Sequence, residues 1–91
     1  MSNEIKLKSI KLLLLTNHQI LISQIEEVSS ELGQPDCKLI EPFLLNEGNK
    51  TLSPWLVELT IENIFMIHST NILTLVDPNS ALLEKYKLLV K

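Results

Sequence analysis

Hydrophobic and polar positions alternate in short blocks along the chain, and most of these blocks favour strands over helices. In residues 61–78, two apolar, β-favouring runs, Ile61–Ile67 and Ile72–Val76, flank the polar break His68–Asn71. This pattern is typical of two strands joined by a tight connection. We expect any ligand of the protein to bind near that break.

A first hairpin is predicted near the start of the chain. Ile10–Leu15 is almost entirely apolar, Thr16–Gln19 supplies turn residues, and Ile20–Ile22 resumes the apolar pattern. No glycine is present in this turn, so Asn17 or His18 is expected to take a positive φ, which Asn tolerates better than most residues.

The following block, Ile20–Val28, admits two interpretations. Ile20 and Ile22 fall on one face of a strand and Ile25 on the other, which indicates a long strand with a bulge or a sharp bend. The apolar residues of Gln19–Leu32 also fall at helical spacing. We favour the strand.

Two further strands are predicted in the middle of the chain. Cys37–Leu45 reads as a strand that Pro42 either bends or confines to a sheet edge, because proline has no N–H to donate. Trp55–Ile61 alternates strictly and predicts a half-buried strand. The alternation breaks just before Ile64, where this strand either kinks or ends and restarts.

The signals change to helical at the C-terminal end. Asp77 is a suitable N-cap and Pro78 suits the first helical position. Apolar residues then recur at helical spacing on one face, so a helix is predicted from Pro78 to about Leu89.

Length and composition predict a single domain over residues 1–91, because two cores of half this size would be unstable. The alternation of Met1–Ser9 either extends the first strand or belongs to a frayed end. Apolar residues make up 45% of the chain, yet so small a domain buries only ~60% of its unfolded surface. We expect the surplus to form a subunit interface, ahead of simple coverage by neighbouring side chains.

The charge balance argues against strong nucleic-acid binding. Eleven acidic residues face eight basic ones, all lysine, for a net charge of −3. Phosphate affinity depends mainly on clustered Lys and Arg, and Arg is the usual reader of base edges. Single-strand binding through base stacking and backbone amides remains open.

No enzymatic or metal chemistry is predicted. Cys37 is the only cysteine, which excludes an intrachain disulfide and suits a reducing compartment. With His18 and His68 it makes no paired ligand spacing, and no glycine signature surrounds it as around a nucleophile. We therefore assign no catalytic residue, no metal and no cofactor.

No membrane association is predicted either. A span needs roughly 20 apolar residues, and the run Leu12–Leu15 ends at Thr16. No small-residue cleavage site follows the run, so a signal peptide is not expected. These features predict a cytoplasmic protein.

The segment Glu62–Pro78 resembles the second signature of Sm-like proteins. In that family an aliphatic residue, Arg, Gly, two variable residues and Ile or Val connect the fourth and fifth strands. The matching positions here are Ile67, His68, Ser69, Thr70, Asn71 and Ile72. His68 and Ser69 stand where the family has Arg and Gly, and the missing Arg removes a stacking and hydrogen-bonding group from the nucleotide pocket.

The first signature is less well kept. Asn17-His18 stands where the family has a turn glycine, Ser23 where its second strand often has another, and Ile25–Val28 resembles the continuation of that strand. Asp36, Cys37 and Lys38 enter the third strand at about the family's place, although its Asp and Asn base readers are not recognisable. The predicted helix is C-terminal, whereas the family's is usually N-terminal.

The resemblance implies a mainly β fold: a strongly bent, five-stranded antiparallel Sm-like (SH3-type) barrel with strands within about 10–76 and a C-terminal helix over about 78–89. It also implies a homo-oligomeric ring, pentamer to heptamer, whose loops Ser29–Pro35 and His68–Asn71 line a pore. Single-stranded RNA is the implied partner, and the lysine and isoleucine richness without arginine resembles a phage version of the family. The candidate RNA-binding residues are His68, Ser69, Thr70, Asn71, Asp36 and Lys38.

Two simpler interpretations do not require RNA binding. The net acidity and the missing Arg favour a non-enzymatic oligomeric scaffold or adaptor for protein partners without nucleic-acid binding. Trp55 begins an alternating apolar face, so we expect a core or interface anchor there rather than a base-stacking platform.

Overall fold

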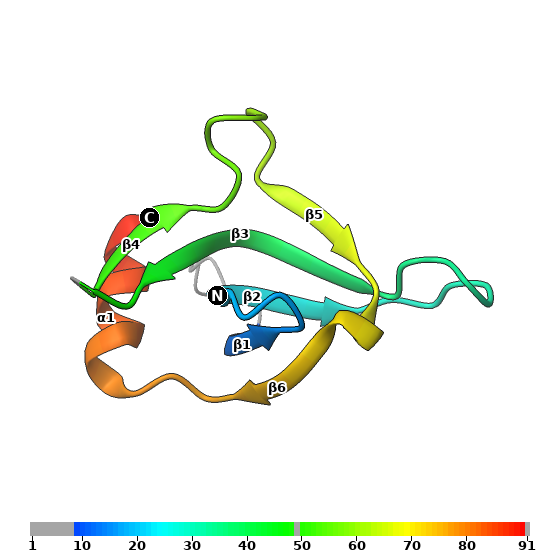
Figure 1. Cartoon of the computed structure of the whole chain (residues 1–91), viewed down its shortest axis with the longest axis horizontal. Helices are drawn as coiled ribbons and strands as arrows, with labels where there is room; N and C mark the ends of the chain where they lie inside the picture. The colour runs from blue at the N-terminus through cyan, green and yellow to red at the C-terminus, as the bar shows by residue number, and fades with distance from the viewer. Residues whose placement is uncertain (1–8, 49, 91) are drawn as a thin grey trace, which may run out of the picture.

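The computed structural model describes residues 9–48 and 50–90, so the ends of the predicted domain and the alternation of residues 1–8 lie outside it. Within these ranges the fold is mainly β, with a helix at the C-terminal end, as predicted (Figure 1). The elements are β1 (Ser9–Leu15), β2 (Ile20–Glu27), β3 (Cys37–Asn46), β4 (Thr51–Pro54), β5 (Ile64–Ile67), the 3₁₀ helix η1 (Ser69–Asn71), β6 (Ile72–Val76) and α1 (Ser80–Leu89).

All six strands belong to one antiparallel sheet with the order β4-β3-β2-β1-β6. The long strand β3 pairs with two partners in turn. Its first half, Cys37–Ile40, pairs with β5, and its second half, Phe43–Asn46, pairs with β4. The last strand, β6, returns to pair with β1, the first strand of the described chain.

The change of partner coincides with a bend in β3 at Glu41 and Pro42. Glu41 has φ of +53°, and its N–H donates to the carbonyl oxygen of Asn63 at 2.6 Å. Pro42 has no N–H, but its carbonyl accepts from the N–H of Trp55 at 2.9 Å. The predicted bend at Pro42 is confirmed, whereas the edge alternative is wrong because β3 is paired on both sides.

The first hairpin and the strand character of the second block are confirmed. In the β1–β2 turn it is His18 that has the positive φ, +72°, and the Asn17 side chain accepts from the N–H of Gln19 at 3.0 Å. The helical alternative for the second block is wrong. The pairing of β2 with β3 shifts register between Ile22 and Gln24, which is the predicted irregularity.

The predicted strand over Trp55–Ile61 is wrong, and so is the total of five strands. Residues 55–59 turn instead, with φ of +61° at Leu56, whose carbonyl accepts from the N–H groups of Leu59 and Thr60. Because β3 bends here, this stretch has no neighbouring strand with which its backbone could pair, despite its alternating sequence. The restart at Ile64 is where β5 begins.

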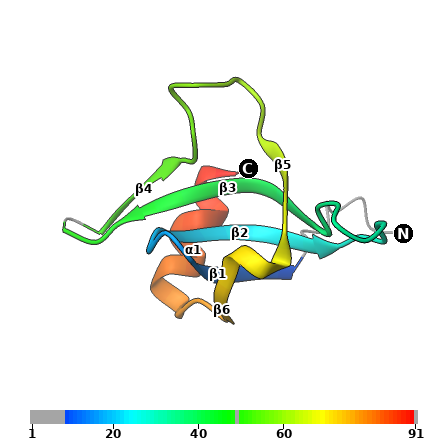
Figure 2. The same ribbon diagram turned by 45° about the vertical axis from the view of Figure 1, so that its right-hand side comes forward.

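The C-terminal helix begins two residues later than predicted. Its N-cap is Asn79, whose side-chain oxygen accepts from the N–H of Leu82 at 2.9 Å. Asp77, the predicted cap, instead forms an ion pair with Lys11 at 2.6 Å. The helix covers one face of the sheet beside the β3–β4 hairpin (Figure 2).

Two apolar clusters form the core. The first centres on Leu13, Leu15, Leu21 and Leu39, and the second, under α1, on Ile22, Phe43 and Tyr86. The Tyr86 hydroxyl accepts from the N–H of Gln24 at 3.1 Å and lies 2.8 Å from the carbonyl oxygen of Glu41. It therefore bonds backbone groups of β2 and β3 next to the register shift and the bend of β3.

Candidate functional site

Two of the candidate residues, distant in sequence, meet at the end of the sheet where η1 joins β5 to β6. Asp36 stands directly before β3, and its carboxylate accepts two hydrogen bonds from Ser69, the first residue of η1. The backbone N–H donates to Oδ1 at 2.7 Å and the hydroxyl donates to Oδ2 at 2.8 Å. We call Asp36 together with His68–Asn71 the loop-end cluster.

These contacts favour the charged form of Asp36. The hydrogen bonds from the Ser69 backbone N–H and hydroxyl, with a smaller contribution from nearby His68, lower the pKa of Asp36 below its ordinary value. Asp36 is therefore a carboxylate at neutral pH. A carboxylate accepts hydrogen bonds from base amino groups but repels phosphate.

The rest of the cluster is held by its backbone and leaves side chains exposed. The N–H of Asn71 donates to the carbonyl oxygen of His68 at 3.0 Å, and the carbonyl of Asn71 accepts from Thr16 at 2.9 Å. Thr70 and Asn71 are exposed and His68 is half-buried. Their side chains are therefore presented on a connection that is tied to the β1–β2 turn.

Lys38 does not join the cluster. It pairs across the sheet with Glu26 on one side and Met66 on the other, and strand alternation directs its side chain away from the face of Cys37. Lys38 therefore lies on the opposite face of β3 from Cys37, whereas the other five candidate residues form the loop-end cluster.

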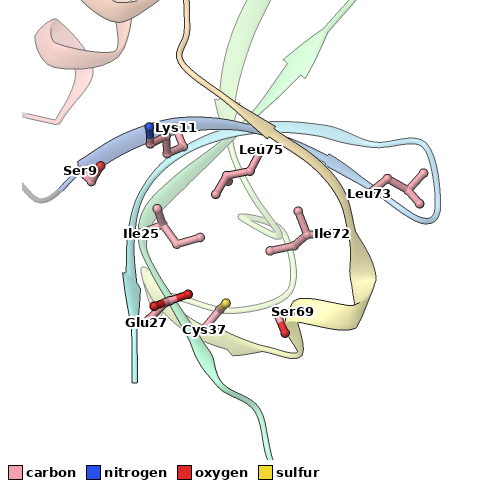
Figure 3. A pocket seen from close by; sticks show the side chains of 9 residues that line it. All are labelled: Ser9, Lys11, Ile25, Glu27, Cys37, Ser69, Ile72, Leu73 and Leu75. Carbon is pink, nitrogen blue, oxygen red and sulfur yellow. The ribbon is translucent and has the colours of Figure 1, made fainter. Parts of the chain in front are cut away.

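Ser69 also lines a hollow of about 420 Å³ around which the sheet curves (Figure 3). Ile25, Ile72 and Leu75 point toward its centre, whereas Leu73 lies out at the side (Figure 3). Its remaining lining residues are Ser9, Lys11, Glu27 and Cys37. Sequence reasoning missed this hollow because its residues come from β1, β2, β3, η1 and β6, and only the fold brings them together.

Cys37 is unsuited to nucleophilic chemistry in this hollow. The side chain is buried, and burial raises the pKa of the thiol, with further contributions from the negative charges of Asp36 and Glu27. The thiol is therefore protonated at neutral pH, and it is the thiolate that attacks or binds metals.

A smaller hollow of about 260 Å³ is lined by Leu15, Thr16, Asn17, Trp55, Ile67 and Asn71. Trp55 is anchored there. Its ring meets Phe65 edge-on at a centroid distance of 5.4 Å, and Nε1 donates to the side-chain oxygen of Gln19 at 3.3 Å. It packs against the first core cluster, as the prediction of a core anchor requires.

The strands on either side of η1 are both edge strands. Over the described residues, β5 pairs only with β3 and β6 only with β1, so each has one unpaired edge. Apolar side chains on both strands are about half exposed: Ile64, Met66, Leu73, Leu75 and Val76. Soluble proteins usually protect such edges with charges, because open edges pair with other chains.

Neither a metal cluster nor a membrane-spanning helix is found in the described part of the chain. No group of three or more His, Cys, Asp or Glu side chains there is arranged to hold a metal ion. None of the helices there has the length and apolar character needed to cross a bilayer.

The chain matches a protein-family profile over most of its length. The profile of a family described as "Family of unknown function (DUF6561)" matches residues 8–91. No curated protein matches the chain.

Proposed function

The chain belongs to the family of unknown function DUF6561, and we propose that it is an Sm-like β-barrel protein that assembles into a homo-oligomeric ring and binds single-stranded RNA. The strand order supports the Sm-like type. The strands β1 to β4 pair in succession, β3 bends sharply and also pairs with β5, and β6 returns to β1 after a 3₁₀ connection at the position of the family's second signature.

The observation that carries the proposal is the pair of open, apolar strand edges on either side of η1. Leu73 is 58% exposed and Met66 47% exposed, although both lie in strands. In an assembly, the edge of β5 in one copy pairs with the edge of β6 in the next. Backbone groups gain partners and the apolar side chains are covered.

Such a contact joins two different surfaces of the same chain, so it is heterologous. A heterologous contact closes into a ring when its repeated rotation completes a full turn, and it forms an open filament otherwise. Rings of five to seven copies are the expectation from the family resemblance. Each ring then displays its loop-end clusters as a repeated set.

The loop-end cluster supports RNA as the ligand. His68 offers a ring for stacking, Ser69, Thr70 and Asn71 offer hydroxyl and amide groups, and Asp36 offers an acceptor for base amino groups. Because arginine is absent and the net charge is −3, stacking and base-edge contacts must supply more of the affinity than phosphate contacts. Binding should therefore depend only weakly on salt.

One observation favours a second function, the scaffold without nucleic acid. Each oxygen of the Asp36 carboxylate already accepts one hydrogen bond from Ser69, which leaves fewer acceptor sites for a base. Such a ring would serve only as a platform for protein partners.

Fluorescence anisotropy with labelled U-rich and A-rich oligonucleotides separates the two functions. The RNA-binding function predicts saturable binding that is weakened in His68→Ala and Asn71→Ala, with unchanged oligomer mass. Lys87→Ala, on the exposed face of α1, is the control and should bind as wild type. Absence of binding by the wild-type oligomer would leave the scaffold function.

A further inference from the structure

The segment Trp55–Asn63, which we call the arm, exposes an unusual density of apolar side chains. Leu59 is 82% exposed and Ile61 fully exposed, and Leu56 and Val57 are exposed as well. Single exposed aliphatic residues are ordinary, but four within six residues form a patch of the kind that marks an interaction site.

The arm projects from the sheet, and hydrogen bonds hold both of its ends. Its two ends are held side by side at the bend of β3, by Trp55 N–H to Pro42 and by Glu41 N–H to Asn63. Between these clamps it stands away from the sheet (Figures 1 and 2). A hollow of about 390 Å³ under its first half, lined in part by Gln19 and Leu44, separates it from the body of its own copy.

A surface of complementary character lies at the start of α1. This hollow, which we call the helix hollow, has a volume of about 270 Å³ and is lined by Leu45, Lys50, Asn79, Ala81, Leu82 and Lys85. Three of its six lining residues are apolar and two are lysines, with Lys85 Nζ donating to the carbonyl oxygen of Lys50 at 3.0 Å. The charged residues of the arm are Glu58 and Glu62, both exposed.

The edge pairing proposed above brings these two surfaces together. An antiparallel pairing of β5 with β6 of the next copy, aligned so that the start of β5 meets the end of β6, places Ile64 beside Val76. The arm leads directly into Ile64, and residues 77–79 lead from Val76 into α1. The arm of one copy therefore arrives next to the helix hollow of its neighbour.

We propose that the arm of each copy docks into the helix hollow of the next copy. The aliphatic side chains of the arm cover Ala81 and Leu82, and Glu58 and Glu62 face Lys50 and Lys85. This inference rests on the proposed ring and specifies a second contact within the same interface, so each copy engages its neighbour by an arm as well as by a strand edge.

Disulfide crosslinking between two singly substituted proteins tests the contact. Leu59→Cys and Ala81→Cys are purified separately, mixed, dissociated, reassembled and oxidised. We expect a crosslinked dimer that contains one copy of each variant. Leu32→Cys, whose side chain is fully exposed in the loop before β3, is the matched control and should give no crosslink with Ala81→Cys.

Charge reversal provides an independent readout. Glu58→Lys and Lys85→Glu should each raise the concentration at which the oligomer dissociates by up to about fivefold, which is the range of exposed ion pairs. The double variant Glu58→Lys/Lys85→Glu should return that concentration toward the wild-type value, because it restores opposite charges. If the destabilisation of the oligomer in the double variant equals the sum of the two single effects, the proposed pairing of arm and helix would be overturned.

The outcomes separate this inference from the proposed ring. A wild-type protein that remains a monomer would overturn both. An oligomer of normal mass that gives no crosslink between residues 59 and 81 would overturn the docked arm alone. Capture of an unrelated apolar peptide by the arm of an intact oligomer, without that crosslink, would also overturn it.

Discussion

The carboxylate of Asp36 binds both donors of Ser69, the backbone N–H at 2.7 Å and the hydroxyl at 2.8 Å. These bonds connect the start of β3 with η1, which are 33 positions apart in the chain. They bring together two residues from different signature segments of the Sm-like resemblance. They also place a fixed negative charge where the proposed RNA ligand binds.

Ser69→Ala should raise the pKa of Asp36 toward its ordinary value. The hydroxyl donor is lost, whereas the stronger contribution, from the backbone N–H, remains, so the rise should be incomplete. Titration of the carboxyl carbon by NMR measures it. Ser30→Ala removes a hydroxyl from the neighbouring loop and should leave the Asp36 pKa unchanged; an unchanged value in Ser69→Ala as well would contradict the assigned cause.

The same shift has a consequence for acid stability. A carboxyl whose pKa is lowered in the folded state stabilises the fold at neutral pH, and this contribution declines as the pH falls below about 4 and through the folded pKa. Urea unfolding at pH 7 and pH 3 should therefore show a smaller acid loss of stability in Ser69→Ala than in wild type. A larger loss in the variant would have the wrong sign.

Tyr86→Phe should destabilise the protein by about 1–3 kcal/mol, because it leaves buried backbone groups of the β2–β3 irregularity without the hydroxyl that bonds them. Tyr86 is fully buried, and its hydroxyl contacts Gln24 and Glu41. The phenylalanine ring keeps the edge-on contact with Phe43. Denaturant unfolding measures this loss. A free energy of unfolding equal to that of the wild type would show that the hydrogen bonds of the hydroxyl do not stabilise the fold.

Lysine on either open edge should dissociate the oligomer without unfolding the chain. In Met66→Lys or Leu73→Lys, an ammonium would be buried between paired strands, so the dissociation constant should rise by at least about tenfold. Leu32→Lys, at a fully exposed position outside both edges, is the control. Mass measurement with circular dichroism checks the result, and unchanged mass in both edge variants would place the interface elsewhere.

Local features of the fold were predictable where a single residue determines the backbone conformation. The β1–β2 turn follows from Asn17 and His18, which tolerate a positive φ, and the bend of β3 follows from Pro42, which lacks an N–H to donate. Asn79 and Asp77 are both good caps. In the structure Asn79 is the N-cap, and Asp77 pairs with Lys11, which is distant in sequence. The helical sequence alone does not predict which of the two residues caps the helix.

The remaining features depend on contacts that no local pattern encodes. The alternation of Trp55–Ile61 is typical of a strand, but the bend of β3 leaves this segment without a strand to pair with. It forms the arm instead. The sequence pointed to both Asp36 and Ser69, but their contact requires β3 and η1 to be adjacent. Lys38 was predicted with them, but alternation along β3 places it on the opposite face from Cys37 and the hollow that Cys37 and Ser69 line.

The mass of the wild-type protein in solution tests the central proposal most directly. Sedimentation velocity at micromolar concentration should give a single species of five to seven copies of the 10.4 kDa chain. A species of 10.4 kDa at that concentration would contradict the ring.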